Sequence, residues 1–246
     1  MSHDDYIKLP RLHVHQELHE NAKISLSSAQ AHYLKNVLRR NEGDRLLLFN
    51  GRDGEWLAAL TALGKKEAVA VPEKCLRPQP APQGETHLIF TPIKKARLDF
   101  LIEKAVELGA THLHPLITAR TEVRHINEER VQAQMIEAAE QCERLAVPRL
   151  SRPVSLAALP GSWDRAIPVY ACIERRDAPQ LKDCDIPDKA AFLIGPEGGF
   201  SPEEIAMIEK MPFSKPVSLG ETVYRAETAA LICLIAGRQH SKIYEK

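Results

Sequence analysis

Apolar and polar positions change in short blocks over the first seventy residues. Two apolar runs, at 45–49 and 55–60, are separated by an Asn-Gly pair and an Asp-Gly pair, which are turn signals. Residues 69–71 have the same strand-like character, and residues 28–39 carry the wider apolar spacing of a helix. The pattern predicts a small, mostly β module at the start of the chain.

Residues 71–85 separate this pattern from a different one. Four prolines and one glycine fall in this window, which indicates an extended linker. Beyond it, apolar runs alternate with helical spacing, and this alternation predicts a mostly parallel α/β sheet. The expected strands are residues 87–90, 112–117, 167–172 and 191–194, and the expected long helices are residues 98–108 and 128–147. The expected domains are residues 1–72 and 86–246, joined by a linker at 73–85.

The composition of the 246-residue chain is that of an ordinary globular protein, with 44% hydrophobic residues. No apolar run approaches the length of a membrane span, and the N-terminus does not resemble a signal peptide. The five cysteines are scattered and form no Cys-x-x-Cys pair, which favours reduced thiols. We therefore expect a cytoplasmic protein without membrane contact.

The formal net charge is zero, which counts against a general nucleic-acid binder. Residues 23–52 nevertheless hold six Lys or Arg side chains against two carboxylates. Such a cluster can meet phosphates, and it is also typical of a solvated protein surface. Charge alone leaves both interpretations open.

A first glycine-rich loop, residues 195–199, follows the apolar run 191–194. Ser201 and Glu204 then form a capping-box pattern that predicts the start of a helix. Glycines let a ligand approach the backbone closely, whereas Glu197 would repel a pyrophosphate. The loop therefore suits a neutral or cationic ligand, or it only turns the chain.

A second loop, residues 219–228, lies between a short strand at 216–219 and an apolar helix. Glu227 is favoured near a helix N-terminus by the helix dipole, so a capping role explains it. Arg225 is disfavoured there, and its position calls for an anionic partner or developing negative charge. Two such loops predict a site that holds a cofactor, which itself carries the chemistry.

Two His-x-His pairs occur, at residues 13–15 and 112–114. On a strand, the two histidines of each pair would face the same side, which suits a metal ion. No third ligand is apparent nearby in the sequence. We therefore expect no metal.

Together the loops resemble those of the SPOUT class of S-adenosylmethionine-dependent RNA methyltransferases. More narrowly, the chain is similar to the family that methylates N3 of a uridine in small-subunit (16S) ribosomal RNA. The resemblance covers nearly the whole chain. Beyond the loops it is carried by residues 10–14, 32–34, 37–39, 43–44, 104, 107–109, 115–121, 137–142, 144 and 147–148.

The resemblance implies a trefoil-knotted α/β methyltransferase domain preceded by a small PUA-like β-barrel that binds RNA. Knots are a rare exception to the rule against threaded chains. The cofactor would be S-adenosylmethionine, bound in a bent form mainly by loop backbone. The partner would be small-subunit ribosomal RNA or the assembled subunit, and a homodimer would complete the active site.

Site residues follow from the same resemblance. The cofactor-binding set is Leu193, Ile194, Gly195, Pro196, Glu197, Gly198, Gly199, Leu219, Gly220, Val223, Tyr224, Arg225 and Thr228. The catalytic set is Arg225, to stabilise the uracil anion or grip a phosphate, and Glu227, for which ordering the loop is favoured over accepting the proton. The RNA-binding set is Arg11, Arg39, Arg120, Gln141 and Arg144.

The chain departs from the family pattern at two places. The family's second loop commonly reads Leu-Gly-x-Arg-Ile-Leu-Arg, whereas residues 221–224 read Glu-Thr-Val-Tyr before Arg225, so one arginine is missing. Glu143 also stands where a small residue is usual. Three alternatives therefore stay open: a SPOUT enzyme of other site specificity, an RNA-binding protein without catalysis, and a phosphate- or dinucleotide-binding enzyme.

Overall fold

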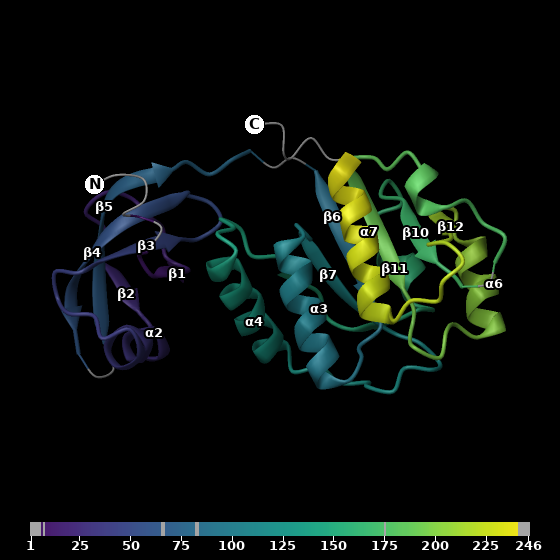
Figure 1. The fold of residues 1–246 in the computed structure, drawn as a ribbon, viewed down its shortest axis with the longest axis horizontal. Coiled ribbons are helices and arrows are strands. Elements are labelled where there is room, and N and C mark those ends of the chain that lie inside the picture. The colour runs from purple at the N-terminus through teal and green to yellow at the C-terminus, as the bar shows by residue number, and fades with distance from the viewer. Residues whose placement is uncertain (1–5, 7, 65–66, 82–83, 175, 241–246) are drawn as a thin grey trace. The chain divides into compact units, whose positions relative to one another are not determined.

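The computed structural model describes residues 6, 8–64, 67–81, 84–174 and 176–240 (Figure 1). The chain divides into two compact units. Unit 1 comprises residues 1–81 and 139–147, and unit 2 comprises residues 82–138 and 148–246. Within the described ranges, no helix is both long enough and apolar enough to cross a membrane.

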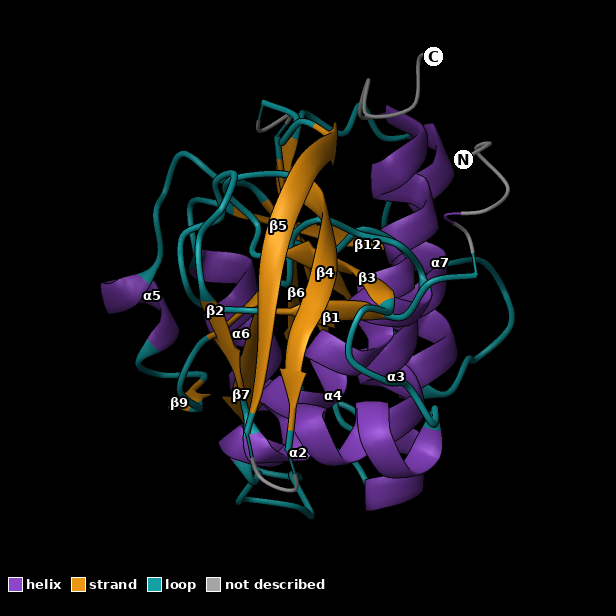
Figure 2. Cartoon of the chain, turned by 90° about the vertical axis from the view of Figure 1, so that its left-hand side faces the viewer, coloured by secondary structure: helices purple, strands orange, loops and turns teal. Residues whose placement is uncertain are grey.

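Unit 1 is built on one five-stranded sheet. Its strands, in spatial order, are β1 (Arg11–His13), β3 (Arg45–Phe49), β4 (Glu55–Leu63), β5 (Ala68–Arg77) and β2 (Ile24–Leu26). β1 pairs with β3 in parallel, and the other pairs are antiparallel. Figure 2 shows the long strands β4 and β5 side by side. The predicted small β module is confirmed.

One helical segment packs on this sheet. The helix expected at 28–39 is present as α2 (Ser28–His32), which continues into the π-helix η1 (Tyr33–Val37). Ser27 caps α2 because its side chain accepts a hydrogen bond from Gln30 N, while the Gln30 side chain accepts one from Ser27 N. Leu34 is fully buried and joins the core of the unit.

Strand β5 runs five residues into the segment for which we expected a linker. It ends at Arg77, which lies opposite Glu55 of β4 and pairs with it at 2.7 Å. Pro72 is tolerated inside β5 near one of the register shifts that interrupt the β4–β5 ladder. Strand pairing and this ion pair therefore hold residues that composition alone places in an extended linker.

Unit 2 is built on a parallel sheet, as predicted. Its strands, in spatial order, are β12 (Ser214–Val217), β10 (Val169–Cys172), β11 (Lys189–Ile194), β6 (Glu85–Phe90), β7 (His112–Ile117) and β8 (Arg149–Leu150), and β9 (Val154–Ser155) pairs with β7. The helical segments of the unit are α3 (Lys95–Glu107), α4 (Glu128–Gln141), α5 (Leu159–Ser162), η2 (Leu181–Asp183), α6 (Pro202–Lys210) and α7 (Ala226–His240). All pairings in this sheet are parallel.

Helices α3 and α7 pack against each other, and α7 also packs on β6 and β11 (Figure 1). The approach of α7 to the sheet is close because Gly237 lies against the ring of Phe192. A Cβ atom at Gly237 would lie 2.8 Å from that ring. A second apolar cluster, which includes Leu193, Phe200 and Ile208, completes the core of the unit.

Helix α4 ends at Gln141, six residues before the end that we expected from Pro148. Glu143 adopts a positive φ of 59°, which turns the chain out of the helix. Side chains of unit 1 then bind the freed carbonyl groups, since Arg77 donates to Glu143 O at 3.1 Å and Arg11 donates to Arg144 O at 3.4 Å. The expected helix end at residue 147 was wrong, because the true end depends on contacts between residues that are distant in sequence.

Candidate functional site

A cavity of about 740 Å³ opens at the carboxyl ends of β10, β11 and β12. We call it the loop cavity, because the first loop and the second loop line most of it. Residues that directly follow β10, such as Ile173 and Glu174, complete its wall. The carboxyl ends of parallel strands are where α/β proteins place their ligand sites.

The first loop turns tightly against the protein core. Gly199 N donates to Pro196 O at 2.8 Å, and Gly199 adopts a positive φ of 69° that favours glycine. A Cβ atom at Gly195 would lie 2.7 Å from the buried ring of Phe200. Residue 195 must therefore be glycine for the loop to keep this conformation.

The helix after the first loop begins as the sequence predicts. Ser201 accepts a hydrogen bond from Glu204 N at 3.2 Å, and the Glu204 side chain accepts one from Ser201 N at 2.9 Å. The second Glu204 oxygen accepts a hydrogen bond from Ala119 N at 2.7 Å. Glu204 thus joins the start of α6 to the segment after β7.

Two arginines from outside the loops hold the first loop. Arg97 of α3 forms an ion pair with Glu197, and Arg120 donates to Gly198 O at 2.6 Å. The negative charge of Glu197, which we interpreted as repelling phosphates, is therefore compensated. The side chains of Arg97 and Glu197 are each about a third exposed, so this pair contributes modestly to stability.

The second loop leaves β12 through a turn at Ser218. Ser218 Oγ accepts a hydrogen bond from Gly220 N at 3.1 Å, and Gly220 adopts a positive φ of 112°. Farther along, Val223 is 53% exposed, and Arg225 is exposed without an ion-pair partner among the described residues. The loop thus presents an available cation beside the cavity that it lines.

Glu227 lies in the first turn of α7 and is only 8% exposed. Its Oε2 atom is buried and has no hydrogen-bond partner within the described part of the chain. The side chain does not belong to the lining of the loop cavity. A carboxylate at a helix N-terminus is stabilised by the helix dipole, and this position suits ordering of the loop.

Most of the predicted cofactor-binding residues line the loop cavity. These are Ile194, Gly195, Pro196, Glu197, Gly198, Gly199, Leu219, Gly220, Val223, Tyr224 and Arg225. Two others do not: Leu193 is 1% exposed and packs in the core, and Thr228 points to solvent from α7. Alternation along β11 explains the first difference, because Leu193 and Ile194 face opposite sides of the sheet.

Sequence reasoning missed several lining residues. Cys172 ends a predicted strand and Val217 lies within one, so their place near the carboxyl edge of the sheet could have revealed them. Phe200 directly follows the first loop and anchors it. Arg97 carries no local signal, because only the fold brings α3 to Glu197.

The RNA-binding candidates differ in exposure. Arg39 and Arg120 are exposed, Gln141 is exposed at the end of α4, and Arg144 is half-buried. Arg11 has a side chain only 7% exposed, which pairs with the buried Glu55 at 2.9 Å. Burial is the main cause that lowers the pKa of Arg11.

The Arg11 guanidinium also lies over the ring of Phe49, 5.0 Å from its centroid. The structure therefore gives Arg11 an internal role in unit 1, whereas the other four candidates keep surface positions. The positive φ of Arg39, 53°, projects that residue from the turn after η1.

Two protein-family models match this chain. A family described as an RNA methyltransferase domain matches residues 79–237, and one described as an RNA methyltransferase PUA domain matches residues 26–73. The boundary between the two matches falls near the end of β5. Together they cover most of both units.

Several known proteins are similar to this chain over almost its whole length. Ribosomal RNA small subunit methyltransferase E of Rickettsia conorii is 34% identical, over 93% of this chain and 94% of its own. The protein of the same name from Synechocystis is 32% identical, over 95% and 78%. A crystal structure of that enzyme from Neisseria gonorrhoeae, bound to S-adenosyl methionine, matches with a TM-score of 0.81 at 28% identity, over 94% of this chain and 97% of that one.

Proposed function

The chain belongs to the RNA methyltransferase family that includes ribosomal RNA small subunit methyltransferase E, and on that premise we propose that it methylates N3 of a uridine in small-subunit ribosomal RNA. The methyl donor is S-adenosylmethionine. Family membership confirms the resemblance identified from the sequence, including the α/β methyltransferase fold and the PUA-like module. The trefoil knot stays a prediction.

The observation that carries this proposal is the loop cavity, where two glycine-containing loops meet at the carboxyl ends of three parallel strands. Its volume of about 740 Å³ lies in the usual range for small-molecule sites. The lining combines apolar side chains, such as Val217 and Leu219, with exposed loop backbone. An adenine ring and its ribose require this combination.

The charges around the cavity also fit the donor, which carries a sulfonium, an ammonium and a carboxylate. Glu174 and Glu221 offer negative charge to the cationic groups, and Arg176 and Arg225 offer positive charge to the carboxylate or to RNA. The close approach of Phe200 to Gly195 leaves no room for a side chain there, so the donor meets backbone. We therefore assign donor binding to the lining members of the predicted set.

When bound, S-adenosylmethionine supplies a methyl group that is already activated by positive charge. Uracil N3 becomes a nucleophile when it loses its imide proton, and the resulting negative charge spreads over N3 and the two neighbouring carbonyl oxygens. Arg225 is exposed beside the cavity and stabilises this charge. A uracil base within folded RNA must also leave its base stack before its N3 atom can align with the methyl group.

Glu227 acts as a positioning residue in this proposal. Its carboxylate is buried at the start of α7 and outside the cavity lining, so it holds the second loop from behind. The backbone of Arg225, two residues earlier, is thereby held in place.

RNA contacts fall to the exposed candidates. Arg39 lies on unit 1 and Arg120 lies beside the first loop of unit 2, where it already holds Gly198. Gln141 ends α4 and Arg144 follows it, and both belong to unit 1. Arg11 donates a hydrogen bond to Arg144 O from inside unit 1. We further propose that the protein works as a homodimer in the cytoplasm, with its cysteines reduced.

Mass spectrometry of ribosomal RNA nucleosides tests the function directly. Cells that lack the gene for this chain should lose N3-methyluridine from small-subunit RNA, and the wild-type gene should restore it. Normal N3-methyluridine in the deleted cells would refute the specificity. Calorimetry on the purified chain with S-adenosylmethionine tests the cofactor separately, and absence of binding would refute the enzyme assignment.

A further inference from the structure

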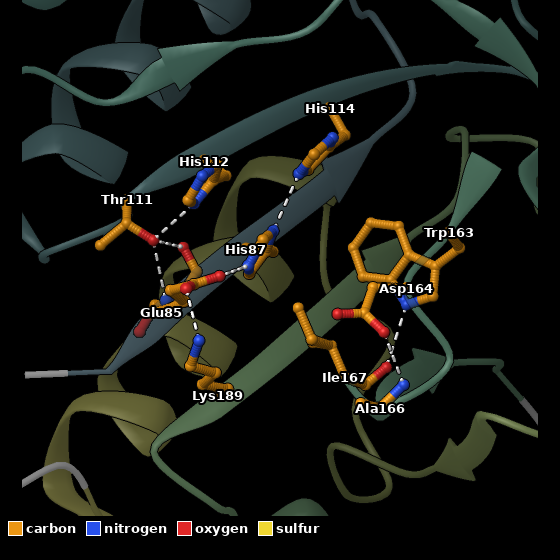
Figure 3. A network of polar contacts seen from close by, with 11 residues as sticks. Glu85, His87, Thr111, His112, His114, Trp163, Asp164, Ala166, Ile167 and Lys189 are labelled. Carbon is orange, nitrogen blue, oxygen red and sulfur yellow. Dashed lines mark hydrogen bonds and ion pairs between the residues drawn. The ribbon is translucent and has the colours of Figure 1, made fainter.

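A group of polar side chains that methyl transfer does not use lies at the amino ends of β6 and β7 (Figure 3). Glu85 and His87 are two residues apart on β6, and His112 and His114 are two residues apart on β7. The strand register places His87 beside His112. Because side chains two apart face one side of a sheet, all four share one face. We call this group the histidine cluster.

The three imidazole rings are stacked. The ring centroids of His87 and His112 are 4.2 Å apart with an interplanar angle of 6°, and those of His87 and His114 are 5.2 Å apart. The Trp163 indole meets His87 and His114 edge-on at 5.4 and 5.3 Å. Its Nε1 donates to Ile167 O at 3.0 Å, which fixes the indole as a wall of the cluster.

The cluster combines the two kinds of ligand atom that divalent transition metals prefer. His87 Nε2 lies 3.1 Å from Glu85 Oε2, and Lys189 Nζ binds the other oxygen of Glu85 at 2.6 Å. Imidazole nitrogens beside a carboxylate form a donor set that divalent transition metals bind.

Hydrogen bonds allow a His112 tautomer that can bind a metal. In one arrangement, the Thr111 hydroxyl donates its proton to Thr86 O at 3.0 Å and accepts from Thr86 N at 2.9 Å. His112 Nδ1, 2.9 Å from the same hydroxyl oxygen, is then the donor in that contact. This arrangement leaves the Nε2 lone pair of His112 available.

His87 can adopt either of two tautomers. In the first, Nε2 donates to Glu85 Oε2 at 3.1 Å, and Nδ1 accepts from His114 Nε2 at 3.0 Å. In the second, Nδ1 donates to His114 Nε2, and His114 Nδ1 donates to Ser151 Oγ at 3.0 Å. Ser151 Oγ can in turn donate to Leu113 O at 3.4 Å. The second arrangement leaves a bare His87 Nε2 facing the Glu85 carboxylate, which favours a cation between them.

We propose that Glu85, His87 and His112 bind a divalent transition-metal ion of the zinc type. The ligand atoms are Glu85 Oε2, His87 Nε2 and His112 Nε2, and a water completes the tetrahedron. One ligand atom from each residue lies within 4.8 Å of the other two. Metal–ligand bonds of about 2.0–2.1 Å place tetrahedral ligand atoms roughly 3.4 Å apart. Side-chain rotations that move the ligand atoms by about an ångström would bring them to this spacing.

Other charges around the cluster tune this site. Arg149 and Lys189 contribute positive potential, and Asp164 contributes negative potential near His87 and Lys189. Lys189 binds Glu85 Oε1 and leaves Oε2 for the ion. The hydrogen bonds from His87 to His114 and from His114 to Ser151 stabilise the His87 tautomer that leaves Nε2 free for the ion. Supporting partners of metal-bound histidines commonly act in this way.

The site lies at the opposite end of the sheet from the loop cavity. His87 is paired with Ala191 of β11, whereas the first loop begins only after Ile194. A bound ion would join β6 to β7 and stabilise the sheet. Its presence is therefore independent of whether the chain transfers methyl groups.

Titration of the metal-free full-length chain with Zn²⁺ tests the site by calorimetry. We expect one equivalent to bind, a rise in the unfolding temperature, and no response to Mg²⁺ at the same concentration. Co²⁺ should bind in competition with Zn²⁺ and give the intense visible absorption of tetrahedral cobalt.

Variants distinguish this site from surface histidines. His112→Asn and Glu85→Gln should each weaken Zn²⁺ binding at least tenfold, whereas the exposed His125 of the same unit provides the matched control, His125→Asn, with unchanged affinity. Glu85→Gln keeps the side-chain shape, so it decides the question even where His112→Asn does not fold. Absence of one-equivalent binding, or equal affinity in all three variants, would overturn the proposal.

Discussion

At the carboxyl ends of β10, β11 and β12 the loop cavity is lined mostly by residues of two loops, whereas at the amino ends of β6 and β7 the histidine cluster consists of side chains on two strands. The first end depends on glycines such as Gly195, where a Cβ atom would lie 2.7 Å from the Phe200 ring. The second end is held by strand register, which places His87 beside His112. Substitutions should therefore affect ligand binding at one end and stability at the other.

The largest effect should come from Arg225, the exposed cation beside the loop cavity. Arg225→Ala should lower kcat for methyl transfer by about 10²–10³-fold, because a side chain that stabilises transition-state charge is lost. Thermal stability and zinc binding should not change. Single-turnover methylation of small-subunit RNA measures the effect, with the exposed Arg152→Ala as control. Equal rates in both variants would remove Arg225 from the catalytic set.

Gly195→Ala should weaken S-adenosylmethionine binding by about 10- to 100-fold. The added methyl group would lie 2.7 Å from the Phe200 ring, and overpacking of this kind costs about 1–3 kcal/mol. Calorimetry measures the affinity. Gly161→Ala is the control, because a Cβ atom at Gly161 meets nothing within 4 Å. Unchanged affinity in Gly195→Ala would show that the first loop adapts.

Thr111→Val tests the other end of the sheet. The substitution removes the hydroxyl that accepts a hydrogen bond from Thr86 N and contacts His112 Nδ1, so unfolding in urea should require about 1–3 kcal/mol less free energy. The affinity for S-adenosylmethionine should be that of the wild type. Thr61→Val, at an exposed threonine of unit 1, is the matched control. A loss of donor affinity in Thr111→Val would mean that the two ends are coupled.

The smallest effect should come from Arg97, which compensates Glu197. Arg97→Gln should weaken donor binding only about 1.5- to 5-fold, because partly exposed ion pairs contribute about 0.2–1 kcal/mol. The difference should shrink at high salt. Lys104→Gln removes the ion pairs with Glu103 and Glu107 on the same helix and should leave donor affinity unchanged. A hundredfold loss in Arg97→Gln would indicate direct donor contact.

The same contrast explains what the sequence could predict. Both loops were found because glycine, proline and the Ser201–Glu204 capping box act over a few residues, and the structure confirms that box. The parallel strands were found because their apolar runs are continuous, as at 112–117. Local chemistry therefore located most of the loop cavity.

Features that depend on contacts between residues distant in sequence could not be predicted. The third member of the histidine cluster, His87, lies 25 residues before His112 and becomes its neighbour only through parallel pairing. The early end of α4 depends on Arg11 and Arg77 binding carbonyl groups more than sixty residues away. Glu143 adopts a positive φ of 59°, a conformation that favours glycine and that the sequence did not indicate.

Gly237 limits the amino-acid substitutions that this protein tolerates. It touches neither donor nor RNA in our proposal, yet its missing side chain sets how closely α7 approaches Phe192. Arg225 stands just ahead of the other end of that helix, twelve residues or about 18 Å away along its axis. Natural variants of this protein should therefore replace Gly237 as rarely as they replace Arg225.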